Sequence, residues 1–335
     1  MTNNVTVQPS GHQFKVEQGE RILDAALKAG LAFPYGCRNG GCGVCKGKVV
    51  SGEVYYPNGA PSCVGLVEHA IGQEALCQAE AASDLLIEVH EVGQPRDVLI
   101  REYPARVIKL ELLSEQVMRV LLKLPDIDRM QFLAGQYIDI LLDDGRRRSF
   151  SIANAPHDDE YIELHIGRVE NGFFTTHVFD AMQENDVVKI DGPWGEFFLR
   201  EESSRPLLFV AGGTGFAPIK GIIEHALQEQ IERPMRLYWG SDNAEGLYLQ
   251  DIAQAWREAG KLMFDAVVSN ADKAHGYRAG LLLQAVVEDQ PDLSGFDVYV
   301  SGSPAMVEAA KQLFEQHGLP KQSLFFDSFE FTADP

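Results

Sequence analysis

The sequence has no long apolar segment and relatively few basic residues. No run of its 335 residues approaches the roughly 18 to 20 apolar positions that a membrane-spanning helix needs. Its beginning, MTNNVTVQPSGHQF, lacks the basic start and the apolar core of a secretory signal peptide. With 29 Lys and Arg against 49 Asp and Glu, the formal net charge is −20, which argues against nucleic acid or an anionic membrane surface as a partner. We expect a cytoplasmic protein, a monomer, that binds neither nucleic acid nor membrane.

Cysteine is also scarce, but it is unevenly distributed. Three of the five cysteines lie in the stretch CRNGGCGVCKGKV. Cys37, Cys42 and Cys45 have the spacing C-x4-C-x2-C, and Cys77 follows later, which is the plant-type [2Fe–2S] ligand pattern. In a reducing compartment, crowded cysteines bind metal or perform redox chemistry more often than they form structural disulfides. The pattern therefore predicts that these four thiolates hold an iron–sulfur cluster.

The residues between the cysteines support a cluster over the alternatives. Gly40, Gly41 and Gly43 would let a loop wrap closely around a cluster, because glycine adopts positive φ angles cheaply and leaves backbone N–H groups free to face sulfur. A zinc site, a disulfide and a redox thiol pair are the alternatives. A structural zinc site usually combines two CxxC pairs, and Cys77 has no such neighbour. For the fifth cysteine, Cys63, we expect a small buried or idle thiol.

Hydrophobic patterning divides the chain into three blocks. The first alternates like a β-hairpin, continues into a short amphipathic helix and includes GKVVSGEV as a second hairpin, which indicates a compact α+β unit. The second is a succession of strands ending with GEFFLR, interrupted by a helix at 175–182, and is typical of an antiparallel barrel or sandwich. The third alternates strands and helices, which predicts a parallel sheet covered on both faces. The expected boundaries are 1–93, a linker at 94–102, then 103–203 and 204–335.

Two stretches of the second block predict a flavin site when taken together. In RRRSFSIANAP, Arg148 can pair with a phosphate while Phe150 lies against a planar ring. Downstream, Gly172, Thr175 and Thr176 stand at the entry to the predicted helix, where free N–H groups and the helix dipole suit a pyrophosphate. Alone, each stretch is unspecific, since arginine clusters are usually solvated and GxxT is common. Behind an iron–sulfur block they favour a flavin.

The third block opens with a glycine turn. In LLFVAGGTGFAP a buried strand leads through Gly213 and Gly215 into a helix that contains Pro218 in its first turn. The pattern departs from the dinucleotide motif GxGxxG because proline replaces the third glycine. The two glycines still allow a pyrophosphate to approach closely, and proline is tolerated at a helix start. We predict a nicotinamide nucleotide site here.

The charges near the second strand of this block bear on which nucleotide binds. Arginine close to that strand accommodates the 2′-phosphate of NADP. The segment YWGSDNAEGLYLQD instead carries Asp242 and Glu245, with no Arg or Lys before Arg257. After the third strand, Lys273 is the nearest base. NADH is therefore favoured over NADPH.

These three blocks, in this order, resemble the ferredoxin–flavin–NAD reductases of the ferredoxin-NADP⁺ reductase superfamily. The likeness covers essentially the whole chain. It is carried by AGQYIDI, RRSFSIANAP, AGGTGFAP, LYWG and FFDSFEF, and is nearest to the CDP-6-deoxy-3,4-glucoseen reductases and the reductase components of bacterial oxygenases. The resemblance implies a β-grasp ferredoxin domain, an antiparallel β-barrel flavin domain and an α/β nucleotide domain with a parallel sheet.

The resemblance also implies roles for individual residues. The cluster ligands would be Cys37, Cys42, Cys45 and Cys77. FAD would be held by Arg148, Ser149, Phe150, Ser151, His165, Ile166, Val169, Gly172, Thr175 and Thr176. The nicotinamide site would be lined by Gly213, Thr214, Gly215, Pro218, Ser301, Gly302 and Met306, with Asp327 and Phe329 covering the flavin.

Two positions depart from the family pattern. Phe150 stands where a tyrosine is common, so stacking on the flavin survives while a hydroxyl contact is lost. Ser301 stands where many relatives have cysteine beside the nicotinamide. An alternative reading of Phe329 is an ordinary core residue at a strand end. We expect local positioning, but not hydride transfer itself, to depend on these differences.

The expected function is an NADH-dependent reductase that passes electrons from NADH to FAD, then to the [2Fe–2S] cluster, then to a separate enzyme. That acceptor would be an oxygenase component or a deoxysugar dehydrase. A stand-alone diaphorase that reduces free flavins or quinones is the alternative. A third possibility treats the first domain as a structural docking module without electron traffic. Arg38, Lys46 and Lys48 around the cysteine loop indicate a mixed or basic docking rim.

Overall fold

The computed structural model of the protein describes residues 2–29, 31, 33–35, 38–91, 98, 100–125, 130–158, 160–270, 272 and 276–329. The chain forms two compact units, Met1–Val98 and Leu99–Pro335, and each is described separately. Cys37 and most of the expected linker at 94–102 lie outside the described residues. Among the described residues, no helix is long and apolar enough to cross a membrane.

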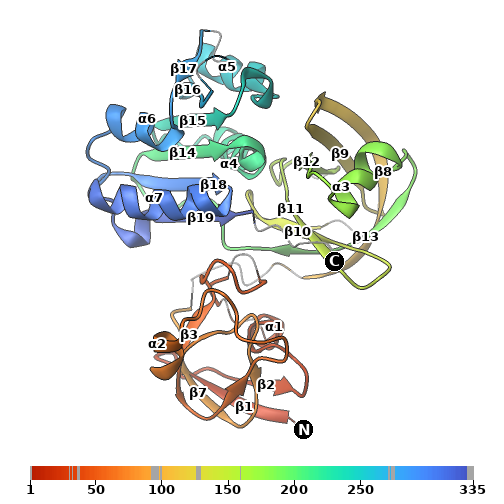
Figure 1. Cartoon of the computed structure of the whole chain (residues 1–335), viewed down its shortest axis with the longest axis vertical. Helices are drawn as coiled ribbons and strands as arrows, with labels where there is room; N and C mark the ends of the chain where they lie inside the picture. Colours follow the sequence, from red (N-terminus) through yellow and green to blue (C-terminus); the bar gives the residue numbers. More distant parts are fainter. Residues whose placement is uncertain are drawn as a thin grey trace. The chain divides into compact units, whose positions relative to one another are not determined.

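The first unit is built on a mixed five-stranded sheet (Figure 1, red to orange). In β1 the alternate residues Val5 and Val7 are fully buried, and so are Ile22 and Leu23 on the buried face of α1. β1 pairs in parallel with β7, while the β1–β2 hairpin is antiparallel as expected. The sheet order is β2 (Gln13–Glu17), β1 (Thr2–Gln8), β7 (Leu85–Glu88), β3 (Lys46–Ser51) and β5 (Gln73–Ala75). The remaining elements are α1 (Ile22–Lys28), α2 (Leu66–Ala70), β4 (Val54–Tyr55) and β6 (Glu80–Ala81).

The second unit begins with a six-stranded antiparallel barrel. An isolated bridge between Ile152 and Leu164 joins the two ends of the sheet and closes it. The helix α3 (Phe173–Asp180) inserts Phe174 and Val178 into the barrel core. The strand order is β11 (Arg147–Ser151), β10 (Tyr137–Leu141), β13 (Val187–Trp194), β8 (Arg101–Ser114), β9 (Val117–Lys123) and β12 (Ile162–Gly167).

The rest of the second unit is a parallel sheet with helices on both faces (Figure 1, green to blue). Successive side chains of β14 point to opposite faces of the sheet. Phe209 lies in the core under α4 and α5, and Val210 lies in the core under α6 and α7. The strand order is β17 (Arg278–Ala279), β16 (Met263–Val268), β15 (Met235–Ser241), β14 (Leu207–Gly212), β18 (Asp297–Gly302) and β19 (Leu324–Ser328). The helices are α4 (Phe216–Gln228), α5 (Gln250–Glu258), α6 (Leu282–Asp289) and α7 (Pro304–Gln316), with short 3₁₀ turns η1 (Gly213–Gly215), η2 (Ala244–Gly246) and η4 (Lys321–Ser323).

This strand order creates a switch point. From β14 the chain moves outward through β15, β16 and β17, then returns to add β18 and β19 on the other side of β14. In open α/β sheets, ligands bind beyond the carboxyl ends of the strands where the order reverses. The glycine turn that follows β14 lies at this point, between β14 and β18.

Two strand predictions are wrong. GKVVSGEV is not a hairpin, because β3 pairs with β5 and β7 while β4 pairs with β6. GEFFLR forms no strand: Phe197, Phe198 and Leu199 are all buried, so the segment does not alternate. The Arg200 guanidinium donates to the carbonyls of Glu196 and Phe198 at 3.0 and 3.2 Å, which occupies groups that a neighbouring strand would otherwise bond.

Candidate cofactor sites

The cysteine loop of the first unit is shaped by its glycines. Gly40 and Gly43 have φ angles of +83° and +72°, in the left-handed region that favours glycine. A Cβ atom on Gly40 would lie 2.5 Å from the Cβ of Pro61, so the loop backbone rests directly against that residue. The Cys63 N–H donates to the Gly40 carbonyl at 3.1 Å, which ties the loop to a second segment.

Two of the predicted ligands, Cys45 and Cys77, meet at this loop. Cys45 and Cys77 are buried with their Sγ atoms 3.1 Å apart, and Cys42 is half-buried in the same loop. The pairing of β3 with β5 brings the two buried thiols together, since the Leu76 N–H donates to the Cys45 carbonyl at 3.2 Å. Cys37 lies outside the described residues. The three described thiols fit the soft, anionic donor set of an iron–sulfur cluster.

The rim of the loop is more neutral than its sequence indicates. Arg38 Nη2 lies 2.7 Å from Asp24 Oδ1, and Lys46 Nζ lies 2.6 Å from Glu68 Oε1. Two of the three basic residues expected at this rim, Arg38 and Lys46, are therefore paired with carboxylates of their own domain.

In the second unit, β11 carries the expected flavin residues. Because successive side chains of a strand point to opposite faces, Arg148 and Phe150 lie on one face of β11, and Ser149 and Ser151 lie on the other. The Phe150 ring lies 5.6 Å from that of Phe174 in α3. Ser149 Oγ donates to Asp139 Oδ1 at 2.6 Å, so that hydroxyl is engaged by the neighbouring strand β10.

The entry to α3 is a tight, preformed turn. Gly172 is its N-cap, and a Cβ atom there would lie 2.7 Å from Thr175 Oγ1 and 3.0 Å from Val169 Cβ. Thr175 Oγ1 accepts from the Val169 N–H at 3.2 Å, while Thr176 continues the helix by donating its N–H to the Gly172 carbonyl. The first-turn N–H groups of a helix have no intrahelical partner, so this cradle fits a phosphate group of FAD.

The nucleotide turn is held against β18. A Cβ atom on Gly215 would lie 2.0 Å from the Ser301 carbonyl oxygen, and one on Gly212 would lie 2.6 Å from Met306 Sδ. At position 215 only glycine permits this approach, because the atom that it meets belongs to the backbone of β18. The Ser301 side chain is fully buried, and its Oγ has no hydrogen-bond partner among the residues that the structure describes. A cradle of this shape with an unsatisfied hydroxyl at its edge fits a polar ligand such as a nicotinamide carboxamide.

The residues predicted to bind the flavin and those predicted to line the nicotinamide site meet at the carboxyl ends of β18 and β19. Ser151 Oγ, at the end of β11, donates to Asp327 Oδ2 at 2.9 Å. Asp327 is the register partner of Ser301, and the Phe329 N–H donates to the Gly302 carbonyl at 2.9 Å. The expected flavin strand and the expected nicotinamide residues are thus neighbours, as hydride transfer between two bound rings requires. Thr214 and Pro218 lie in η1 and the first turn of α4, beside them.

Comparison with known proteins identifies this arrangement. Residues 5–82 match the 2Fe-2S iron-sulfur cluster binding domain family, residues 104–199 the oxidoreductase FAD-binding domain family and residues 209–312 the oxidoreductase NAD-binding domain family. A CDP-6-deoxy-L-threo-D-glycero-4-hexulose-3-dehydrase reductase from Yersinia pestis is 38% identical, covering 98% of this chain and 99% of that protein. The chain belongs to the three-domain [2Fe–2S]–FAD–NAD reductases.

Other members of this reductase family point the same way. Reductase component 2 of a terephthalate 1,2-dioxygenase from a Comamonas species is 34% identical over 98% of each chain. The crystal structure of the Amycolatopsis cytochrome P450 reductase GcoB matches with a TM-score of 0.86, at 33% identity and 98% coverage of each chain. The predicted fold class and the set of three cofactors are confirmed: the reductase has domains for a [2Fe–2S] cluster, FAD and NAD.

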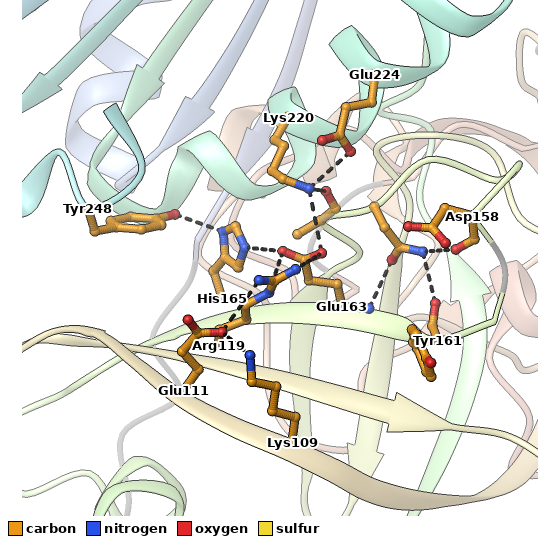
Figure 2. Close-up of polar contacts among 12 residues, drawn as sticks. Lys109, Glu111, Arg119, Asp158, Tyr161, Glu163, His165, Lys220, Glu224 and Tyr248 are labelled. Atoms are coloured by element: carbon orange, nitrogen blue, oxygen red, sulfur yellow. Dashed lines mark hydrogen bonds and ion pairs between the residues drawn. The ribbon is translucent and has the colours of Figure 1, made fainter. Parts of the chain in front are cut away.

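His165 lies where the barrel meets the α/β sheet within the second unit of the reductase (Figure 2). Its buried ring contacts Glu163 Oε1 through Nε2 at 2.8 Å and the Tyr248 hydroxyl through Nδ1 at 3.0 Å. Both ring nitrogens of His165 are therefore hydrogen-bonded within the protein. Contact between the flavin and residues 165–169, including Ile166, stays a prediction. Sequence reasoning missed Glu163, Lys220 and Tyr248, which belong to the same polar cluster as His165, because no local pattern marks them.

A buried carboxyl in the segment after β13 predicts a pH dependence of stability. Glu196 is largely buried, and its Oε2 has no hydrogen-bond partner among the described residues. Burial raises its pKa to about 8, although Arg200 acts in the opposite direction. The folded protein therefore binds a proton that the unfolded chain releases above its ordinary pKa of 4.5, and stability falls as pH rises from 4.5 through 8.

We expect Glu196→Gln to remove this loss, because the amide is neutral at every pH. The variant should gain on the order of 4 kcal/mol over the wild type between pH 5 and pH 9, as measured by chemical unfolding at both values. Glu202→Gln, at an exposed neighbouring site, is the control and should show no such divergence. An equal difference between Glu196→Gln and wild type at both pH values would disprove a raised pKa.

Proposed function

We propose that this reductase takes a hydride from NADH and delivers the electrons, through FAD and the [2Fe–2S] cluster, to a separate enzyme. When bound, FAD supplies the chemistry that accepts an electron pair and releases single electrons. The observation that carries the proposal is the contact of Ser151 with Asp327 beside Ser301. This contact supports the binding of the nicotinamide ring next to β11, the strand predicted to bind the flavin.

The described residues support distinct tasks in this reaction. Arg148 and the α3 entry at Gly172 would bind the FAD phosphates, and the turn at Gly215 would bind the NADH pyrophosphate. The buried Ser301 hydroxyl would donate to the nicotinamide carboxamide, which fixes the face of the ring presented to the flavin. Because this serine replaces the usual cysteine, it offers a stronger hydrogen-bond donor and a weaker nucleophile.

We infer that NADH is the preferred reductant. Asp242 follows β15 at the carboxyl edge of the sheet, and Ser269 Oγ donates to its Oδ1 at 2.9 Å. An acidic residue at this place hydrogen-bonds the ribose 2′-hydroxyl of NAD and repels the 2′-phosphate of NADP.

Asp242→Ser tests this preference. The ratio of kcat/KM for NADH to that for NADPH should fall about tenfold, the effect of roughly 1.4 kcal/mol, with ferricyanide as the acceptor. Asp251→Ser, which removes an exposed carboxylate from the first turn of α5, is the matched control and should leave the ratio unchanged. An unaltered ratio in Asp242→Ser would exclude this residue from nucleotide selection.

The electron acceptor is proposed to be a protein. The relatives are named as reductases of a hexulose dehydrase and of a terephthalate 1,2-dioxygenase, and both acceptor types would use the same single electrons. The test compares NADH oxidation with cytochrome c and with the small acceptors menadione and free FMN. Faster turnover with cytochrome c, dependent on the cluster, supports a protein acceptor. Equal rates in cluster-free protein would favour the stand-alone diaphorase.

A further inference from the structure

The helix that follows the nucleotide turn rests directly on the flavin-binding barrel. A Cβ atom on Gly221, in α4, would lie 2.9 Å from the Asn154 carbonyl oxygen and 3.4 Å from that of Ile152. This barrel segment is itself fixed, because the Asn154 side chain donates to the carbonyls of Asp158 and Tyr161. The backbone contact sets how closely the two domains of the second unit approach each other.

Lys220, the residue before this glycine, crosses from the helix into the barrel (Figure 2). It is only 5% exposed. Its Nζ donates to the Ala153 carbonyl at 3.2 Å, lies 3.5 Å from Glu163 Oε2 and 3.0 Å from Glu224 Oε2 of its own helix. A buried ammonium must be paired and hydrogen-bonded to be tolerated, and here two of its three partners belong to the barrel.

A second contact between the domains is the hydrogen bond from Tyr248 to His165. The Glu163 carboxylate can only accept, so the hydrogen between it and His165 belongs to Nε2. Nδ1 is then an acceptor, and the Tyr248 hydroxyl donates to it at 3.0 Å. Burial raises the pKa of Tyr248 well above its ordinary value and lowers that of His165, which keeps the hydroxyl protonated and the imidazole neutral. The direction of both hydrogen bonds is therefore fixed.

Glu163 is the centre of this cluster. Burial acts to raise its pKa, but the hydrogen bond from His165 and the charges of Lys220 and Arg119 outweigh burial and leave the pKa at about 2. Arg119 Nη2 donates to Glu163 Oε2 at 3.1 Å. Buried ion pairs contribute little net stability compared with apolar packing, whereas removing one member is costly. Such a cluster is therefore suited to fixing one geometry between the two domains.

The cluster is connected to the predicted nucleotide site on one side and to the predicted flavin site on the other. On the nucleotide side, the Tyr248 ring packs edge-to-face on Trp239 with centroids 5.2 Å apart, and Trp239 Nε1 donates to the Gly213 carbonyl at 3.0 Å. On the barrel side, Ala153 lies two residues after Ser151 of the flavin strand, and β12 carries both Glu163 and His165. A shift of Lys220 or Tyr248 would therefore move the nucleotide turn relative to the flavin strand.

We propose that Lys220, Tyr248 and His165 are positioning residues for hydride transfer. They hold the nucleotide turn at one distance from the flavin strand. The inference rests on the proposed function, since it requires NADH and FAD to bind at these two ends. Small displacements of this kind are costly, because about 1 Å of misplacement can slow a reaction by about 100-fold.

The test is anaerobic stopped-flow reduction of the bound FAD by NADH in Lys220→Met and Tyr248→Phe. The limiting rate should fall by about tenfold or more, while FAD content and the Kd for NAD⁺ stay within about twofold of wild type. The long-wavelength absorption of nicotinamide stacked on flavin should weaken in parallel. Calorimetry of the full chain without nucleotide supplies a second readout: the barrel and the α/β domain should unfold in separated transitions in Lys220→Met.

Controls separate positioning from general damage. Lys220→Arg keeps the charge and should recover most of the rate. Lys311→Met removes a lysine whose 3.5 Å ion pair with Glu308 lies on α7, away from this cluster, and should leave the rate unchanged. If Lys220→Met does not fold, the limiting rate of Tyr248→Phe decides the test, because that variant loses only one hydroxyl group.

Limiting rates and stacking absorption within about twofold of wild type in both Lys220→Met and Tyr248→Phe would overturn the proposal, even if their melting temperatures fell. If the proposed function itself is wrong, a different result is expected: NADH will not reduce the FAD of the wild-type protein at all.

Discussion

Cys45→Ser is expected to lose cytochrome c reduction by roughly 100-fold or more, while NADH still reduces ferricyanide through the flavin. Cys45 is buried with its Sγ 3.1 Å from that of Cys77, so serine there removes a thiolate from the centre of the donor set. Replacing an outer-shell partner of a metal already costs about 10- to 100-fold, and loss of a ligand should cost more. Iron content, sulfide content and both NADH-dependent activities measure the effect.

Cys63→Ser is the matched control, because this cysteine is adjacent to the loop but is not a predicted ligand. Its N–H donates to the Gly40 carbonyl, a backbone contact that serine preserves. Cluster content and cytochrome c reduction should match the wild type. Cytochrome c reduction that persists in Cys45→Ser would show that electrons bypass the cluster, and would favour the structural docking module as the role of the first domain.

Gly215→Ala is expected to lower kcat/KM for NADH by about 100-fold and to destabilise the protein by about 3 kcal/mol. The new Cβ would lie 2.0 Å from the Ser301 carbonyl oxygen and 2.5 Å from its carbon. These are backbone atoms of β18, so the neighbour cannot rotate away, and either the turn or the strand must move. Steady-state kinetics with ferricyanide and thermal unfolding measure the two effects.

Gly295→Ala provides the comparison, because a Cβ atom there meets nothing within 4 Å. This variant should behave as wild type in both measurements. If Gly215→Ala kept wild-type kcat/KM for NADH while unfolding at a lower temperature, the turn would contribute to stability without contacting the nucleotide, and the site would have to be sought elsewhere.

The features that were predictable from the sequence depend on short spacings. The cysteine pattern, the alternation in β1 and the glycine turn after β14 each lie within one segment, so the order of the residues determines the local geometry. Ser301 and Asp327 came instead from the family resemblance. Their contacts depend on register between strands distant in the chain, which spacing alone does not reveal.

The features that were missed depend on tertiary contact. Lys220 has the sequence context of an ordinary helical lysine, and it is buried only because Gly221 lets α4 approach the barrel. Tyr248 reaches His165 from a segment 83 positions away. GEFFLR has the composition of a strand, but Arg200 takes up its carbonyls. In each case a partner distant in the sequence, or a side chain binding the backbone, decides the outcome.

Anaerobic titration of the purified protein with NADH tests the central claim most directly, with visible absorption and electron paramagnetic resonance recorded at each step. Electron transfer from flavin to cluster predicts bleaching of the flavin absorption together with the low-temperature resonance of a one-electron-reduced [2Fe–2S] centre, from a single reductant that donates only electron pairs. Flavin bleaching without that resonance, in protein that contains its full complement of iron, would contradict electron transfer from the flavin to the cluster.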